Sequence, residues 1–405
     1  MNTILIVGAG GVGSVAAHKC AQLPETFQEI HLASRTLSRC HLVANSIRQR
    51  TGREISTFCL DADNLTEAIA LLHKLSPDVL LNLALPYQNL TLMEACLATG
   101  TNYLDTANYE HPEIARFEYK SQWRYHERFR EKNICALLGS GFDPGVTNVF
   151  TSFGAKHYFD EINELDIIDV NGGENHEPFS TNFNPEINIR EVSAACRHWE
   201  GDQFVESPAF STHRSFSCPE GIGDFEIYRM YHEELESLTV AYPSLRRAQF
   251  WMSFSPSYLL HLKVLTNVGM TSIHPVDYHG KSIVPLQFLK SILPDPGRLG
   301  ESTTGQTCIG CVLRGKKGAQ SRSIYIYNVC SHESAFRETG SQAVSYTTGV
   351  PAMIGAKMIL QKKWFEAGVW NMEHFDPDPF MQDLDSFGLS WSIVESDPFH
   401  GKAAQ

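Results

Sequence analysis

Three glycines near the amino terminus have the spacing that lets a backbone approach a dinucleotide phosphate. Residues 4–13 run Ile-Leu-Ile-Val-Gly-Ala-Gly-Gly-Val-Gly, in which Gly8, Gly10 and Gly13 fit Gly-x-Gly-x-x-Gly. The pattern follows an apolar strand candidate and opens a helix candidate at about 12–23, whose first amides can bind phosphate. Gly8 permits the tight turn, Gly10 lets the backbone approach the pyrophosphate, and Gly13 allows close helix–strand packing. The segment predicts a dinucleotide site; a glycine-rich turn that binds nothing is the alternative.

The end of the second strand candidate indicates which dinucleotide is bound. A carboxylate there would bind the ribose 2′-hydroxyl of NAD, but the segment runs Ala33-Ser34-Arg35-Thr36 and has no acid. Arg35 can pair with a 2′-phosphate, and Ser34 and Thr36 can donate hydrogen bonds to it. The segment therefore favours NADP(H), with a solvated surface arginine as the alternative.

Alternating strands and helices are the elements that must position this loop. Strands that alternate with helices form a parallel sheet with right-handed crossovers, and ligands bind beyond the carboxyl ends of the strands. The sequence thus predicts an α/β fold, a Rossmann-type doubly wound parallel sheet. Its strand candidates are 3–7, 29–33, 55–60, 79–85, 102–105 and 134–138.

The region after Gly139 differs in composition and pattern from the part before it. It is rich in loop-forming residues and in the alternation of apolar and polar residues that is typical of strands. It predicts an inserted α+β domain built on an antiparallel sheet. Its expected elements are a strand at 164–170, a loop at 171–186, a helical stretch after 224 up to Leu238, a hairpin of 307–314 and 322–330 with 315–318 as its turn, and a helix from Pro351 to about Trp364.

Composition excludes several classes of protein. The 405 residues include 46 acids and 33 bases, a net charge of −13, and no long basic run, which argues against a nucleic-acid or anionic-membrane partner. Ten cysteines lie scattered along the chain rather than in a disulfide framework. No apolar run reaches the roughly 20 residues of a membrane span, and no signal peptide is evident. We expect a soluble cytoplasmic protein.

Several segments resemble the saccharopine dehydrogenase family. They are GAGGVG (8–13), ASRT (33–36), LDADN (60–64), the long segment 82–108, GFDPGVTN (141–148) and TTGVPAMIGAKMIL (347–360). The resemblance implies a discontinuous NADP-binding domain, residues 1–145 plus about 345–405. It also implies a substrate-binding and dimerisation domain at 146–344, and a homodimer.

The resemblance also implies site residues. Carried over position by position, NADPH would contact Gly10, Gly11, Val12, Ser34, Arg35, Thr36, Asp61, Leu85 and Thr106. Phe142, Asp143 and Pro144 would lie near the nicotinamide. Asn108 and Tyr109 would face the substrate.

The implied reaction is NADPH-dependent reductive condensation of L-aspartate β-semialdehyde with a diamine, 1,3-diaminopropane or putrescine. Saccharopine-forming members carry arginine-containing segments that grip a dicarboxylate, whereas here 221–226 and 247–252 offer acids and aromatic residues. That departure suits a substrate with a cationic end. A saccharopine reductase-like enzyme acting on another semialdehyde, and a non-enzymatic NADP-binding regulator, are the alternatives.

The chemistry needs a proton donor and groups that hold a carboxylate and an ammonium. Asp143, between two glycines, is the candidate general acid, with a structural turn carboxylate as the alternative. Arg190 and Arg197 are candidates for the substrate carboxylate, or else solvated charges. Candidates for the distal ammonium are Glu174, Glu177, Asp224 and Glu226, with Trp199, Trp251 and Tyr242 as possible pocket aromatics.

Cys308 and Cys311 form a Cys-x-x-Cys pair inside a strand candidate. Residues three apart on a strand point to opposite faces, which opposes shared metal ligation. We therefore predict no metal site.

Overall fold

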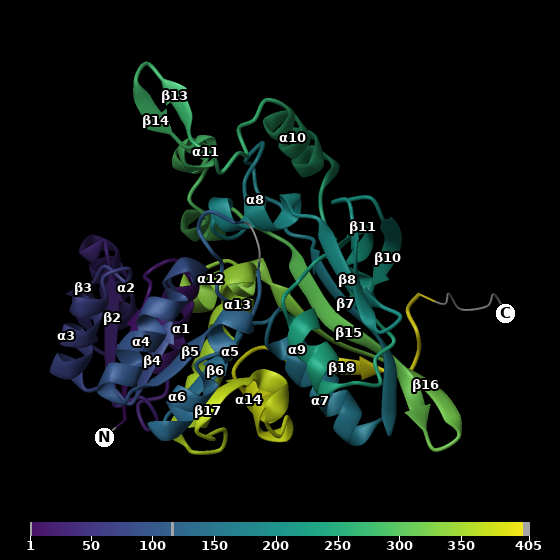
Figure 1. Cartoon of the computed structure of the whole chain (residues 1–405), viewed down its shortest axis with the longest axis horizontal. Helices are drawn as coiled ribbons and strands as arrows, with labels where there is room; N and C mark the ends of the chain where they lie inside the picture. Colours follow the sequence, from purple (N-terminus) through teal and green to yellow (C-terminus); the bar gives the residue numbers. More distant parts are fainter. Residues whose placement is uncertain (1, 115–116, 400–405) are drawn as a thin grey trace.

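The structure is a computed structural model that describes residues 2–114 and 117–399 (Figure 1). Two sheets form its framework, and one hydrophobic core includes residues of both, among them Ile4 and Ile6 of the first and Leu165 and Ile167 of the second. Shared burial of this kind holds the two sheets in a fixed relation.

The first sheet is parallel throughout and has the strand order β17-β6-β5-β4-β1-β2-β3. This order reverses between β1 and β4, which is the switch point of a Rossmann fold, so the predicted doubly wound sheet is confirmed. Its strands are β1 (Thr3–Val7), β2 (Glu29–Ser34), β3 (Ser56–Cys59), β4 (Val79–Asn82), β5 (Asn102–Asp105), β6 (Cys135–Leu138) and β17 (Gly368–Asn371). The associated helices are α1 (Gly11–Ala21), α2 (Leu37–Thr51), α3 (Leu65–Leu75), α4 (Asn89–Thr99), α5 (Lys120–Trp123), α6 (His126–Glu131) and α13 (Ala343–Leu360).

The second sheet has nine strands and is mixed rather than purely antiparallel, because β7 and β12 pair in parallel. Its strands are β7 (Glu161–Asn171), β8 (Cys196–Glu200), β9 (Gln203–Ser207), β10 (His213–Cys218), β11 (Gly223–Met230), β12 (Arg247–Ser253), β15 (Gln306–Lys317), β16 (Gln320–Ser331) and β18 (Trp391–Val394). The associated helices are α7 (Val146–His157), α8 (Pro185–Ser193), α9 (Glu234–Ala241), α10 (Pro256–Asn267), α11 (Pro285–Ile292), α12 (His332–Thr339) and α14 (Asp378–Ser386). A small hairpin, β13 (Val276–Tyr278) and β14 (Lys281–Ile283), projects beside α11 (Figure 1).

Three predicted elements are wrong in part. The stretch 223–230 is strand β11, because it pairs along its length with β10 and in its second half with β12, and only 234–241 is helical. Helix α13 begins eight residues before Pro351, which lies inside it. An interior proline lowers the stability of an isolated helix, because it removes a backbone hydrogen bond. In α13 nearly every residue is buried, and the stabilisation from that burial outweighs this local cost. The predicted hairpin exists, but β15 continues through 315–317 and β16 begins at Gln320, which leaves only residues 318–319 as the turn.

The carboxyl-terminal region divides between the two sheets. Helix α13 packs against α1, where Gly349 lies against Val15, and β17 extends the first sheet beside β6. Strand β18 instead pairs with β16 of the second sheet. The prediction that all residues after about 345 return to the first domain is therefore wrong for β18.

Candidate active site

The glycine loop has the close packing that its pattern predicts. Gly8 has a φ of +115°, and a Cβ there would lie 2.3 Å from the carbonyl oxygen of Leu83. A Cβ on Gly13 would lie 1.9 Å from the carbonyl oxygen of Gly8. Gly10 has no such neighbour within 4 Å, so the open side of the loop lies at Gly10, at the start of α1. This arrangement leaves room for a phosphate against backbone amides.

The end of β2 lies in the same cavity wall as the glycine loop. Ser34, Arg35 and Asp61 line this wall, and the structure adds Arg39, which the sequence analysis missed. Arg39 forms an ion pair of 2.7 Å with Asp295. Thr36 precedes α2, is exposed and lies outside the lining residues, so the geometry does not bring it to the cavity.

A cavity of about 660 Å³ extends from this loop into the space between the two sheets. Val12 and Gly11 line its end beside the glycine loop, which we call the nucleotide end, and Leu85, Thr106 and Pro144 line it farther in. At its inner end it reaches a group of ionisable side chains that we call the acidic end: Asp143, Asp169, Glu191, His232 and Glu233.

Phe142 does not contribute to this cavity. Its side chain is 1% exposed and packs edge-to-face on Phe150, with 6.1 Å between ring centroids. The predicted cofactor contact of Phe142 is therefore wrong for its side chain, because the alternation of the loop turns Phe142 into the core and Asp143 into the cavity.

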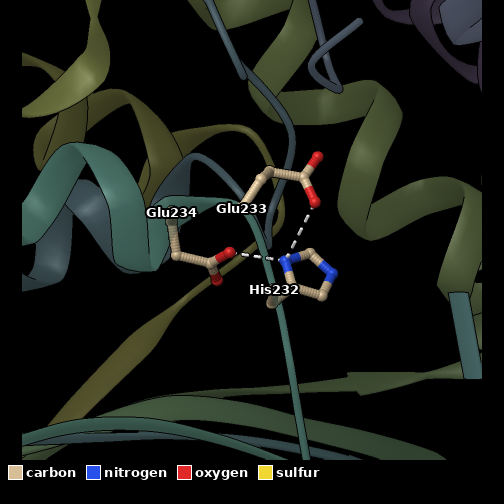
Figure 2. A group of neighbouring side chains, drawn as sticks. All are labelled: His232, Glu233 and Glu234. Carbon is tan, nitrogen blue, oxygen red and sulfur yellow. Dashed lines mark hydrogen bonds and ion pairs between the residues drawn. The ribbon is translucent and has the colours of Figure 1, made fainter. Parts of the chain in front are cut away.

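His232 lies among carboxylates at the acidic end (Figure 2). Its Nδ1 faces Glu234 and lies 3.5 Å from Glu233, and its Nε2 lies 3.1 Å from Glu191. Its ring stacks on Phe250 of β12 at 4.3 Å. Burial alone would lower the pKa of His232, but the charges of Glu234 and Glu233 outweigh it and hold that pKa well above its usual range.

Three carboxyl groups at the acidic end, those of Asp143, Asp169 and Glu233, have pKa values above their ordinary range. Burial raises the pKa of Glu233 to about 8, although His232 opposes the shift. Burial raises the pKa of Asp169 to about 6 and that of Asp143 well above its ordinary value. Groups that exchange protons near neutral pH and face a cavity are typical of catalytic sites.

Three donor residues here could in principle hold a cation, since ligand atoms of His232, Glu233 and Glu234 lie within 4.8 Å of one another. However, Nδ1 and Nε2 of His232 both face carboxylate oxygens. A ring held in this way donates from both nitrogens, whereas a metal ligand must present a free lone pair. We interpret the group as a buried ion pair.

Two residues predicted to face the substrate lie just behind the cavity wall. Asn108 is fully buried, and its backbone N–H donates to Glu233 Oε1 at 3.3 Å. The backbone N–H of Tyr109 donates to Gln122. Neither residue is among those that line the cavity. Asn108 instead supports Glu233.

Arg190 is bound by protein groups and does not line the cavity. Its guanidinium is buried and is bound by Glu110 at 2.7 Å and by the carbonyls of Pro112 and His111. Arg197 is likewise paired with Glu118 and Glu236. These arginines tie residues 110–112 and Glu118 to the second domain, and the predicted substrate contact of Arg190 is wrong because its donors are already engaged.

Asp224 is also misplaced by the sequence analysis. It lies exposed on β11 and accepts a hydrogen bond from Ser217. It does not line the cavity. The other candidate acids and aromatics, Glu174, Glu177, Glu226, Trp199, Trp251 and Tyr242, do not line it either.

The Cys-x-x-Cys pair behaves as strand geometry predicts. Cys308 belongs to the hydrophobic cluster on the outer face of the second sheet, and Cys311 belongs to the shared core on the inner face. Their thiols therefore do not meet.

Four groups at the acidic end were missed from the sequence: Asp169, Glu191, His232 and Glu233. The tripeptide His232-Glu233-Glu234 is a local signal that could have been noticed. Asp169 and Glu191 carry no such signal, because only the fold brings β7 and α8 to this end of the cavity.

Comparisons with known proteins agree with this architecture. The model of the saccharopine dehydrogenase NADP binding domain matches residues 4–137, and that of the saccharopine dehydrogenase C-terminal domain matches residues 141–389. A solved structure of saccharopine dehydrogenase (L-Glu forming) from Saccharomyces cerevisiae superposes with a TM-score of 0.70 at 13% identity, covering 97% of this chain and all of that one. That likeness supports the fold.

Curated relatives match almost end to end. Carboxyaminopropylagmatine dehydrogenase of Synechocystis is 52% identical over 399 residues, covering 98% of this chain and 99% of the relative. Carboxynorspermidine synthase of Vibrio alginolyticus is 40% identical, covering 98% and 97%, and that of Vibrio cholerae is 37% identical, covering 98% of each.

Fold, glycine loop and relatives together define an NADP-dependent oxidoreductase that acts on CH–NH bonds, with NADPH as its cofactor. The chain belongs to the saccharopine dehydrogenase family. An enzyme with small-molecule substrates is thus confirmed over the alternative of a non-enzymatic regulator. None of the described helices is long and apolar enough to cross a membrane.

Proposed function

We propose that the enzyme catalyses the NADPH-dependent reductive condensation of L-aspartate β-semialdehyde with an amine that carries a second cationic group. The observation that carries the proposal is the polarity of the cavity. Arg35 and Arg39, the latter paired with Asp295, lie at its nucleotide end, whereas its inner end collects four carboxyl groups around one imidazole. An anionic cofactor suits the first end, and a dicationic amine suits the second.

The amine that we place first is agmatine. The relative at 52% identity is named for carboxyaminopropylagmatine, and those at 40% and 37% are named for carboxynorspermidine. A guanidinium forms paired hydrogen bonds with carboxylates, and the acidic end offers several of them. The diamines 1,3-diaminopropane and putrescine, predicted from the sequence, stay as the second candidates.

Before the reduction, the reaction needs one group to accept a proton from the amine and one group to donate a proton to the carbinolamine. The amine arrives as an ammonium, loses a proton, and attacks the aldehyde to give a carbinolamine. Protonation of the carbinolamine hydroxyl releases water and leaves an iminium ion. NADPH supplies the hydride that reduces this carbon to the secondary amine. The residues of the acidic end supply the cation site and move the proton, and the burial of His232 and Glu234 keeps bulk water from these charges.

The test is NADPH oxidation, followed at the nicotinamide absorbance, with aspartate β-semialdehyde and agmatine, putrescine or 1,3-diaminopropane in turn. Each reaction is run with and without the semialdehyde and the amine. We expect oxidation that requires both substrates, with the highest kcat/KM for agmatine. A higher kcat/KM for a diamine would overturn the order of amines. Oxidation with none of them, by protein shown to bind NADPH, would overturn the reaction, and aminoadipate semialdehyde with glutamate would be assayed next.

We also propose the homodimer that the family resemblance implies. Apolar side chains are exposed on α10 and on α11, of which α11 lies beside the projecting hairpin (Figure 1). They include Leu260, Val264, Phe288 and Ile292, each more than half exposed. A second copy of the chain is the partner that would cover them. Light scattering should give twice the mass of the chain, and Val264→Glu should reduce it to the monomer mass.

A further inference from the structure

Two carboxyl side chains meet in the wall of the cavity. Asp143 comes from the loop after β6, and Asp169 comes from β7 of the second sheet. Alternation along β7 turns Asp169 to the inner face with Leu165 and Ile167, whereas Ile168 belongs to the outer cluster. Asp143 and Asp169 both line this part of the cavity, and their carboxyl groups lie within hydrogen-bonding reach of each other. Two domains therefore each contribute one carboxyl group to the same point.

A hydrogen bond between two carboxyl groups requires a proton, because ionised carboxylates only accept. Among the described residues, no protein donor reaches the buried Oδ2 of Asp143. Two buried carboxyl groups in such contact cannot both be ionised at neutral pH without a large free-energy cost, so one proton stays on the pair.

The groups around the pair agree with a single shared proton. Those that act electrostatically on it are His232 in the segment before α9, Glu234 of α9 and Glu191 of α8, with Cys311 of β15 on the same face of the second sheet and Cys308 on the opposite face. His232 favours the ionised form of each aspartate, and the glutamates favour the protonated form. Because carboxylates hold both ring nitrogens of His232, the ring is a positioning residue rather than a proton carrier.

We propose that Asp169 is a catalytic residue and that Asp143 and Asp169 work as one pair that holds a single proton. This proposal rests on the proposed function. The ionised member takes a proton from the substrate ammonium, and the free amine then attacks the aldehyde. A second proton passes from the attacking nitrogen to the new alkoxide oxygen, which gives the neutral carbinolamine. The protonated member gives its proton to the carbinolamine hydroxyl, as the carbon–oxygen bond breaks and water leaves. One proton enters and one leaves, so the pair returns to its starting state before hydride transfer.

The kinetic test replaces Asp169 with asparagine, which keeps the size of the side chain but removes the second carboxyl group. We expect Asp169→Asn to lower kcat by about 100-fold while the Kd for NADPH stays within twofold. The solvent deuterium isotope effect should rise, and the isotope effect of 4-deuterated NADPH should fall towards 1, because proton transfer becomes rate-limiting. Asp169→Glu should recover part of the rate. Glu161→Gln, at the exposed start of the same strand, is the matched control and should leave kcat unchanged.

A second measurement does not depend on the reaction. Carbon-13 NMR of aspartate carboxyl groups in substrate-free enzyme should show Asp143 and Asp169 titrating in two well-separated steps. In Asp169→Asn, the remaining Asp143 should titrate in a single step. If no amine supports NADPH oxidation but two coupled steps are seen, the proposed function fails and the proton-sharing pair stands. A kcat within twofold of the wild-type value in a folded Asp169→Asn protein, or independent titration of both groups near pH 4, would overturn the pair.

Discussion

The two ends of the cavity are built in opposite ways. The nucleotide end is made mainly of backbone from one short segment, residues 8–13, with Arg35 from the segment after β2. The acidic end is made of side chains from β7, α8, the loop after β6 and the segment before α9. Binding a phosphate needs amides that a local turn can present, whereas tuning a proton needs charges that only burial brings together. Mutations should therefore act differently at the two ends.

The largest effect is expected from His232→Gln at the acidic end. It removes the positive charge from Glu234, Glu233 and Glu191, of which the first two are almost fully buried. Breaking a buried ion pair from one side costs about 3–5 kcal/mol, so urea unfolding should show a loss of this size. Equal stability of the variant and the wild-type enzyme would contradict the buried ion pair.

The substitution expected to disrupt the nucleotide end most strongly is Gly13→Ala. The new Cβ would lie 1.9 Å from the carbonyl oxygen of Gly8, so the loop must open. NADPH affinity, measured by nicotinamide fluorescence, should fall about 100-fold, equal to about 2.7 kcal/mol. Gln22→Ala, at the far end of α1, is the control and should bind NADPH normally. Normal binding by Gly13→Ala would show that the phosphate lies elsewhere.

The acidic end should also control how stability depends on pH. The pKa of Glu233 in the folded protein is about 8, above the value of about 4.3 in an unfolded chain. The folded state therefore holds this proton more tightly, and the resulting stabilisation is present at low pH and lost as pH rises towards 8. Between pH 5 and 8, Glu233→Gln should remove up to about 1.4 kcal/mol per pH unit of this decline, measured by urea unfolding. A parallel pH dependence in the two proteins would contradict the raised pKa.

The preference for NADPH over NADH tests the role of Arg35 at the nucleotide end. Arg35 is exposed and follows β2, where no carboxylate is present. Arg35→Ala should weaken NADPH by about 10-fold and leave NADH unchanged, because only NADPH carries the 2′-phosphate. Ratios of kcat/KM for the two cofactors measure this effect. An equal loss for both would show that Arg35 has another role.

The smallest effect is expected at Asp224, which the sequence analysis placed in the substrate site. The side chain is exposed and bonded to Ser217. Asp224→Asn should leave kcat and the KM for the amine within twofold, whereas Glu191→Gln, in the cavity wall, should raise that KM. A clear loss in Asp224→Asn would move the cationic site away from the acidic end.

The sequence by itself determined the parallel sheet, the glycine loop and the absence of an acid after β2, since each depends on residues close together in the chain. Asp143 was also found there, because a short motif marks its loop. The sequence did not determine that Pro351 lies inside a helix or that 223–230 is a strand, since burial and strand pairing overrode local conformational preference. Only the tertiary structure decided that Arg190 is already paired, and that Asp169, Glu191 and Glu233 converge on the cavity. The physical reason is that a carboxylate has no fixed chemistry of its own: its solvent exposure and its neighbours, hundreds of residues away in some cases, set whether it is a surface charge or a proton carrier.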